Sequence, residues 1–216
     1  RQVVYYKPIE DLVKVGLKKP VENFLRIPAP GLMRTIYNGL KLNQSKTTDE
    51  FGYAETITFN AKLINALVLH IGMNAVAERS PTNRGFNTKT SQVALLVDLM
   101  NYGSNEFKYI MLNAIANQLR YPNSHTHWFI GIILHFFSSN SIWNSSTSTK
   151  LAVQEIITRV LLERRIVNKP HPWGLTILFT ELVKNESYGL FELPFVKNSI
   201  EEVKNIFDTL STNVKG

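Results

Sequence analysis

The feature that most constrains this chain is the helical spacing of apolar residues on both sides of Pro122. Apolar residues recur at intervals of three and four over positions 107–119, which predicts a helix with one broad buried face. Pro122 lacks a backbone donor and biases Tyr121 away from helical geometry, so we expect the helix to stop there. Ser124 is then a candidate N-cap for a very apolar helix that continues to Phe137. The stretch predicts a helical hairpin.

The same spacing recurs along most of the chain. Pro8 is placed to begin a first helix through Lys18, which Pro20 interrupts, and further helices are predicted over residues 32–40, 57–75, 93–100, 149–167 and 172–184. Polar segments without periodicity predict loops at 44–53, 80–88 and 138–149. No segment has the pattern of a strand, so the sequence predicts an all-α fold.

Two predicted hairpins, over residues 104–138 and 148–184, each have roughly the length of one helical repeat of the HEAT type. Their sequences do not resemble each other, so any repeat is architectural. We therefore expect stacked antiparallel helix pairs in a HEAT-like arrangement. No change of composition marks a domain boundary, and we expect residues 1–216 to form a single unit.

The C-terminal region ends on a capping-box pattern, in which Ser199 and Glu202 are placed to satisfy each other's backbone donors at the start of a last helix. Residues 188–196, just before it, are mostly apolar or aromatic. That segment is too short for another long helix and too apolar for a free linker. It therefore either plugs the end of the helical stack or lines a slot for a partner segment.

The sequence argues against catalysis and against bound metals or cofactors. Cysteine is absent, which excludes disulfides, thiolate metal sites and cysteine nucleophiles. The carboxylates are dispersed, and no Gly-rich phosphate loop or nucleophile elbow occurs. His125 and His127 invite a metal hypothesis, but residues two apart on a helix point to nearly opposite sides and no third ligand lies nearby in sequence. We expect no catalytic, cofactor or metal site.

The charge admits a different function. The net charge is +7 and the isoelectric point is near 9.5. Such a balance suits an acidic or nucleic-acid partner, so RNA binding through a basic surface is the alternative to protein docking. The basic residues form no dense run in the sequence, however, and a solvated basic surface explains them as well.

Aromatic residues in or beside turns are the candidates for partner binding, because large aromatic side chains at helix ends can anchor a bound segment. Apolar residues of the predicted last helix extend this set. The candidates are Tyr121, Trp143, Trp173, Tyr188, Phe191, Phe195, Val203 and Phe207.

Three blocks carry a resemblance to a known family. They are LINALVL at residues 63–69, LNAIANQLRYPNSHTHWF at 112–129, and a discontinuous block at 157–185 that begins ITRVLLER, continues IVNKPHPWGL and ends ELVKN. In this order they resemble the C-terminal homology domain of the largest, scaffold subunit of the CCR–NOT deadenylase complex. The resemblance runs from about residue 63 to the C-terminus, and residues 1–55 match loosely. That domain is longer than this chain, which would correspond to its C-terminal half, with residues 56–216 as its helical-repeat core.

The resemblance implies a non-catalytic scaffold, because the nuclease activity of that complex belongs to other subunits. It implies docking of two smaller NOT-box subunits, numbers two and three or five, largely through extended segments. Short-motif regulators at the C-terminal end and a weak RNA contact would add to these partners. The implied roles are mRNA decay, translational repression and transcription regulation, and we expect a soluble protein of the cytoplasm and nucleus.

Overall fold

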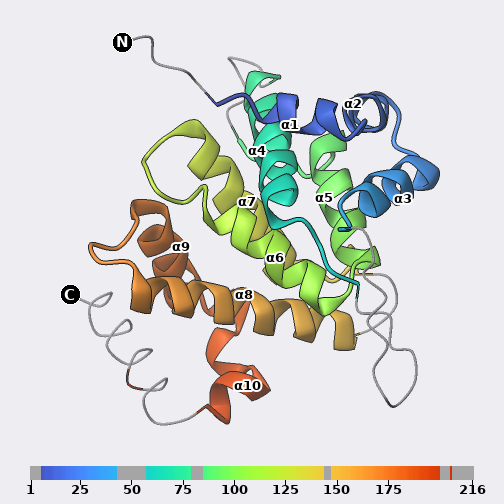
Figure 1. Cartoon of the computed structure of the whole chain (residues 1–216). Coiled ribbons are helices and arrows are strands. Elements are labelled where there is room, and N and C mark those ends of the chain that lie inside the picture. The colour runs from blue at the N-terminus through green and yellow to red at the C-terminus, as the bar shows by residue number, and fades with distance from the viewer. Residues whose placement is uncertain (1–5, 43–56, 79–84, 144–146, 200–204, 206–216) are drawn as a thin grey trace, which may run out of the picture. The chain divides into compact units, whose positions relative to one another are not determined.

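The computed structural model describes residues 6–42, 57–78, 85–143, 147–199 and 205. Within these residues the secondary structure is helical, and the single β-type pairing is an isolated antiparallel bridge between Lys41 and Phe59. The prediction of an all-α fold is confirmed (Figure 1). The chain divides into two compact units, Arg1–Ile115 and Ala116–Gly216. The sequence-based expectation of one HEAT-like unit stays a prediction.

The first unit contains the helices α1 (Pro8–Lys14), α2 (Lys18–Arg26), α3 (Pro30–Gly39), α4 (Ala61–Ala77), α5 (Ser91–Tyr102) and α6 (Asn105–Ala116). Helix α1 packs on α4, α2 packs on α3 and α5, and α4 packs on α5. The ring of Tyr37 meets those of Phe59 and Phe107 edge to face, at centroid distances of 5.4 and 4.9 Å. Residues from three separate segments thus form one aromatic core.

Two helix boundaries in the first unit differ from the predictions. Gly16 has a φ of 74° and separates α1 from α2, so Pro20 lies in the first turn of α2 instead of interrupting a helix. Proline is tolerated there because the first-turn N–H groups have no intrahelical acceptor. Helix α4 begins at Ala61 and not at Ile57, because the Asn60 side chain caps it by accepting a hydrogen bond from Leu63 N.

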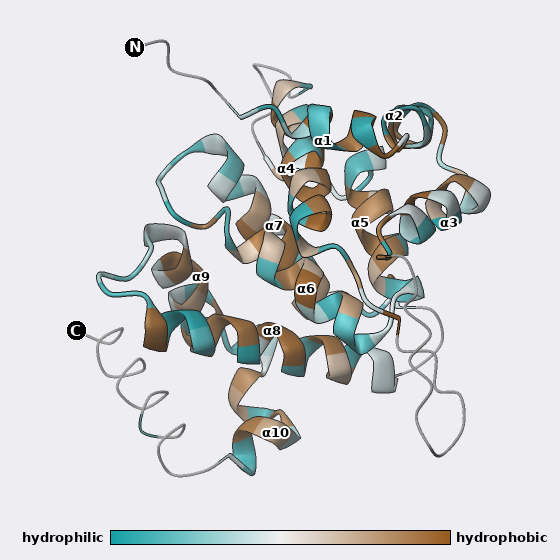
Figure 2. Cartoon of the chain, viewed as in Figure 1, coloured by the Kyte–Doolittle hydropathy of each residue, from teal (hydrophilic) through white to brown (hydrophobic). Residues whose placement is uncertain are grey.

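The second unit contains α7 (Ser124–Ser138), α8 (Thr147–Val167), α9 (Trp173–Lys184), the 3₁₀ turns η1 (Glu186–Tyr188) and η2 (Leu190–Glu192), and α10 (Pro194–Lys197). Helix α7 packs on both α8 and α9. Figure 2 shows brown and teal bands alternating along α8, as expected of a helix with one buried face. Its predicted apolar stripe is buried at Val153, Ile157, Val160 and Leu161.

The two helices predicted on either side of Pro122 are present, but their bounds differ from the prediction. Helix α6 ends at Ala116, well before Pro122, and the N-cap of α7 is Asn123 and not Ser124. The Asn123 side chain accepts a hydrogen bond from Thr126 N at 2.9 Å. Residues 117–123, here called the hairpin connector, are not helical, and other parts of the chain bind several of their backbone carbonyls, as described below.

Several predicted features lie outside the described residues. They are the loop at 44–53, most of the loop at 80–88, and the capped helix that includes Val203 and Phe207. No helix in the described part of the chain is both long enough and apolar enough to cross a bilayer.

Candidate functional site

The structure brings Tyr121 and Trp173 together although they are far apart in sequence. Trp173 begins α9, and its backbone N–H donates to the carbonyl of Arg120 at 3.3 Å. The Trp173 ring meets His127 edge to face, with centroids 5.3 Å apart. Tyr121 is 66% exposed, and Trp173 is half-buried. The hairpin connector and the start of α9 therefore form one surface with an exposed aromatic residue.

This surface rests on a tightly packed junction. Gly174 N donates to Leu119 O at 2.9 Å, and the Thr126 hydroxyl lies 2.8 Å from Gln118 O and 2.6 Å from Tyr121 O. A Cβ atom at Gly174 would lie 2.5 Å from Cγ2 of Thr126 and 2.9 Å from Leu119 O. Only glycine permits this approach, so Gly174 and Thr126 fix where α9 meets the connector. We call this group the hairpin junction.

The C-terminal cluster (residues 186–197) alternates between inward and outward side chains. Leu190, Leu193 and Val196 are buried, whereas Phe191 is 39% exposed. Tyr188 packs edge to face on Phe137 at 6.2 Å, and burial raises the pKa of its phenol. Gly189 adopts a φ of 59° between η1 and η2, a left-handed geometry that glycine adopts without strain. Buried and surface residues therefore coexist in one short segment, in which Phe191 is exposed and Phe195 is half-buried.

Trp143 does not suit a partner-binding role in this structure. Its side chain is only 6% exposed and packs against Phe136 at a ring-centroid distance of 5.8 Å. The prediction placed it on the surface because it interrupts a polar connector. The structure instead folds the indole into the core, where it serves packing.

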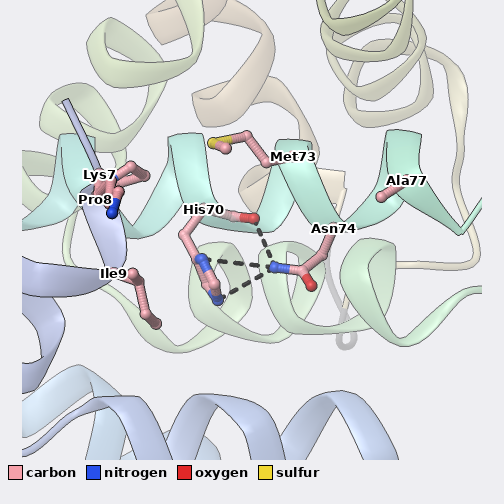
Figure 3. Close-up of a pocket in the computed structure, with 7 residues that line it drawn as sticks. All are labelled: Lys7, Pro8, Ile9, His70, Met73, Asn74 and Ala77. Atoms are coloured by element: carbon pink, nitrogen blue, oxygen red, sulfur yellow. Dashed lines mark hydrogen bonds between the residues drawn. The ribbon is translucent and has the colours of Figure 1, made fainter. Parts of the chain in front are cut away.

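A pocket of about 340 Å³ opens in the first unit between the start of α1 and one face of α4. Figure 3 shows Lys7, Pro8 and Ile9 on one side of it and residues of α4 on the other. His70 and Asn74 supply its polar atoms on α4, with Asn74 Nδ2 lying 3.1 Å from His70 Nε2 and donating to His70 O at 2.9 Å. Burial lowers the pKa of His70. The residues that line this pocket include no carboxylate and no hydroxyl group, and several of them are apolar.

The other histidines also have structural partners. His135 Nδ1 lies 2.9 Å from Ser139 Oγ, and His171 Nδ1 donates to Asn168 O at 2.9 Å in the turn before α9. Among the described residues, no group of three His, Asp or Glu side chains is placed to hold a metal ion. The contacts of His135 and His171 are therefore typical of residues that serve packing and turn formation.

Comparison with known proteins identifies the family. The family model described as "CCR4-Not complex component, Not1" matches residues 2–211. The chain belongs to the Not1 family. The resemblance expected from the three sequence blocks is thereby confirmed.

Members of this family match the chain over nearly its whole length. It is 44% identical over 209 residues to General negative regulator of transcription subunit 1 of Saccharomyces cerevisiae, covering 96% of this chain and 10% of the relative. A solved structure described as "Not1 C-terminal domain in complex with Not4" is 43% identical, with a TM-score of 0.77 over 95% of this chain and 39% of that one. The NOT1 superfamily homology domain from Chaetomium thermophilum is 30% identical, with a TM-score of 0.80 over 99% and 41%. The chain thus corresponds to a small part of a Not1 subunit.

Two of the sequence blocks that carried the Not1 resemblance meet at the hairpin junction. Leu119 and Thr126 belong to the block at 112–129, and Gly174 belongs to the block that contains PHPWG. Sequence reasoning did not find Thr126 or Gly174, because nothing in the local pattern links positions so far apart. A glycine at the second position of a helix was the one available signal. Such a residue is unfavourable in a helix unless close packing requires it.

Proposed function

We propose that this chain is a non-catalytic docking domain of a Not1-type scaffold subunit, and that it binds smaller subunits of the CCR4-Not complex. The observation that carries the proposal is the likeness, at 43% identity and a TM-score of 0.77, to a Not1 C-terminal domain solved in complex with Not4. The names of the relatives support it, because they describe a complex component and a regulator of transcription, and not an enzyme.

The partners in this proposal are the two smaller NOT-box subunits, numbers two and three or five. They would bind mainly as extended segments that become ordered on the helical surface and bury apolar side chains there. The mechanism is tethering, because holding regulators on the scaffold that carries the nucleases raises their effective concentration near a bound message. The processes served are mRNA decay, translational repression and transcription regulation, in the cytoplasm and the nucleus.

The C-terminal cluster is the proposed contact for the apolar side chains of such a segment. Its exposed member, Phe191, lies next to the buried Leu190, so two neighbouring substitutions separate binding from folding. Phe191→Ala shortens an exposed side chain and should therefore cost little stability. Leu190→Ala empties a core position and should cost about 2–5 kcal/mol.

The test is isothermal titration of the purified chain with the purified smaller NOT-box subunits. Wild-type chain should bind, and Phe191→Ala together with Phe195→Ala should weaken binding while the thermal midpoint stays nearly unchanged. The matched control, Leu190→Ala, should lower the thermal midpoint but leave the folded fraction competent to bind. A wild-type chain that binds neither subunit would refute the docking proposal.

Direct RNA binding is the second candidate, favoured by the net charge of +7. Its signature is a steep loss of affinity with salt, since each phosphate contact releases condensed counterions. Binding of single-stranded RNA in the micromolar range or tighter at physiological salt would support it. Apolar docking of a protein segment depends far less on salt.

A further inference from the structure

The surface around Tyr121 and Trp173 is formed by two segments that contain basic residues but no Asp or Glu. Residues 117–129 and 164–176 contain Arg120, Arg164, Arg165 and Lys169 and not one Asp or Glu. Hydrogen bonds hold the two segments together. Arg164 Nη2 donates to Asn117 Oδ1 at 2.8 Å, and backbone bonds join Gly174 and Trp173 to the carbonyls of residues 119 and 120. Folding therefore gathers basic residues that are scattered along the sequence.

The four cations differ in their surroundings within the described part of the chain. Arg164 and Arg165 lie in the last turn of α8, where they offset the negative end of the helix dipole. Arg120 and Lys169 are exposed residues outside helices, and neither belongs to an ion pair within the described part of the chain. Their charge therefore faces solvent.

The helix geometry strengthens the positive potential. Helices α7 and α9, of 15 and 12 residues, both begin at this surface, at Ser124 and Trp173. The N-terminal end of a helix carries a partial positive charge, so both dipoles favour an anion here. The exposed Tyr121 and the half-buried Trp173 add apolar area to the same two segments. We call Arg120, Tyr121, Lys169 and Trp173 the hairpin patch.

We propose that the hairpin patch binds an acidic segment of a partner protein that carries one aromatic or aliphatic side chain among Asp and Glu residues. The carboxylates would pair with Arg120 and Lys169, and the apolar side chain would pack against Tyr121 and Trp173. This inference rests on the proposed docking function and specifies the chemistry of one partner segment. An acidic peptide fits better than RNA because two exposed cations and two aromatic residues suit a short segment, whereas a single strand of RNA needs a groove that follows its backbone.

The test uses the 216-residue chain and a fluorescein-labelled probe peptide of eight Glu residues around one central Phe, followed by fluorescence anisotropy at low and physiological salt. Two further probes are the same peptide with Ala in place of Phe, and a twelve-nucleotide oligouridine. The charge-reversal variant Arg120→Glu/Lys169→Glu should weaken binding of the Phe peptide by about tenfold or more. Replacing the Phe of the peptide should weaken its binding to wild type but not to Tyr121→Ala.

A matched control separates the patch from overall charge. Lys19→Glu/Arg34→Glu reverses one exposed Lys and one exposed Arg in the first unit, with the same change of net charge. It should leave peptide affinity within about twofold of wild type, because the proposal assigns binding to the cations of the patch and not to the net charge. If the patch reversal fails to fold, as judged by its circular dichroism spectrum, Tyr121→Ala/Lys169→Ala replaces it.

Three results would overturn the inference. They are equal losses for the patch and control variants, a lack of peptide binding by a chain that still captures the NOT-box subunits, and oligouridine binding tighter than peptide binding. The second result leaves the docking proposal intact while refuting the patch. The third would reassign the surface to RNA.

Discussion

The hairpin junction makes an unusual prediction, that replacing a helical glycine by alanine destabilises the protein. Gly174 is the second residue of α9, and at an unhindered helical position Gly→Ala stabilises by about 0.5–1 kcal/mol. At Gly174 the added Cβ would lie 2.9 Å from Leu119 O and 3.1 Å from Leu119 Cα. These are backbone atoms, which cannot rotate away as a side chain can. The start of α9 must therefore move outward.

That movement sets the size of the effect. Overpacking of this kind costs about 1–3 kcal/mol. It also lengthens the bonds from Gly174 N to Leu119 O and from Trp173 N to Arg120 O, now 2.9 and 3.3 Å, and a lost hydrogen bond costs about 0.5–1.5 kcal/mol. Subtracting the gain from reduced chain entropy leaves a net destabilisation of about 1–3 kcal/mol for Gly174→Ala.

Urea denaturation followed by tryptophan fluorescence measures this change in the second unit, which contains α9. The three tryptophans, Trp128, Trp143 and Trp173, all lie in the second unit. With a urea dependence of about 2 kcal/mol per molar, a loss of 2 kcal/mol lowers the midpoint by about 1 M.

The chain offers a matched control for this substitution. Gly31 is the second residue of α3, and a Cβ there meets nothing within 4 Å. Gly31→Ala should therefore leave the tryptophan-detected midpoint unchanged, and it should hold or raise stability measured by circular dichroism. A Gly174→Ala chain as stable as wild type would refute the packing argument.

Three further predictions concern caps, the junction and pH. Thr126→Val should destabilise by about 1–3 kcal/mol, because it removes the single hydroxyl donor that Gln118 O and Tyr121 O share, and Thr126→Ser should cost less in the same urea assay. Asn123→Ala should cost about 1 kcal/mol because the N-cap of α7 is lost, and Ser124→Ala should cost clearly less in thermal melts. A larger loss for Ser124→Ala would show that Ser124 is the cap. Burial lowers the pKa of His70 and His135 below the ordinary 6.5, so just below that pH the unfolded chain binds more protons than the folded chain. Stability should therefore fall as the pH is lowered through that range. Replacing both histidines by Gln should reduce the dependence of the urea midpoint on pH.

The helices could be predicted because their apolar spacing is a local property of the sequence. The end of α6 could not, and Leu119 shows why. Leu119 continues the apolar period and is buried as predicted, yet it lies beyond the last helical residue, Ala116. Apolar periodicity indicates which residues are buried, not whether they are helical. Leu119 lies in the non-helical connector, and its carbonyl accepts a hydrogen bond from Gly174 of α9. That contact joins distant segments and leaves no local signal.

The candidate site was predictable only in part, for a related reason. Aromatic residues beside turns were expected on the surface, which holds for Tyr121 and Phe191 but not for Trp143. Whether a turn residue points outward depends on how the connector folds back, and a single sequence does not encode that locally. The basic character of the hairpin patch was missed because Arg120 and Lys169 lie far apart along the chain. Val203 and Phe207 stay predictions, since they lie outside the described residues.

The hairpin connector also shows how binding and folding can use the same few residues without interfering. Within it, Arg120 and Tyr121 contribute to the fold through their backbone carbonyls, which accept from Trp173 N–H and the Thr126 hydroxyl. A carbonyl accepts the same hydrogen bond whatever side chain its residue carries. The side chains of Arg120 and Tyr121 are exposed and take no part in these bonds, so the proposed docking can use them, whereas Thr126 and Gly174 are fixed by packing. Charge reversal at Arg120 thus tests recognition, and alanine at Gly174 tests the fold that presents it.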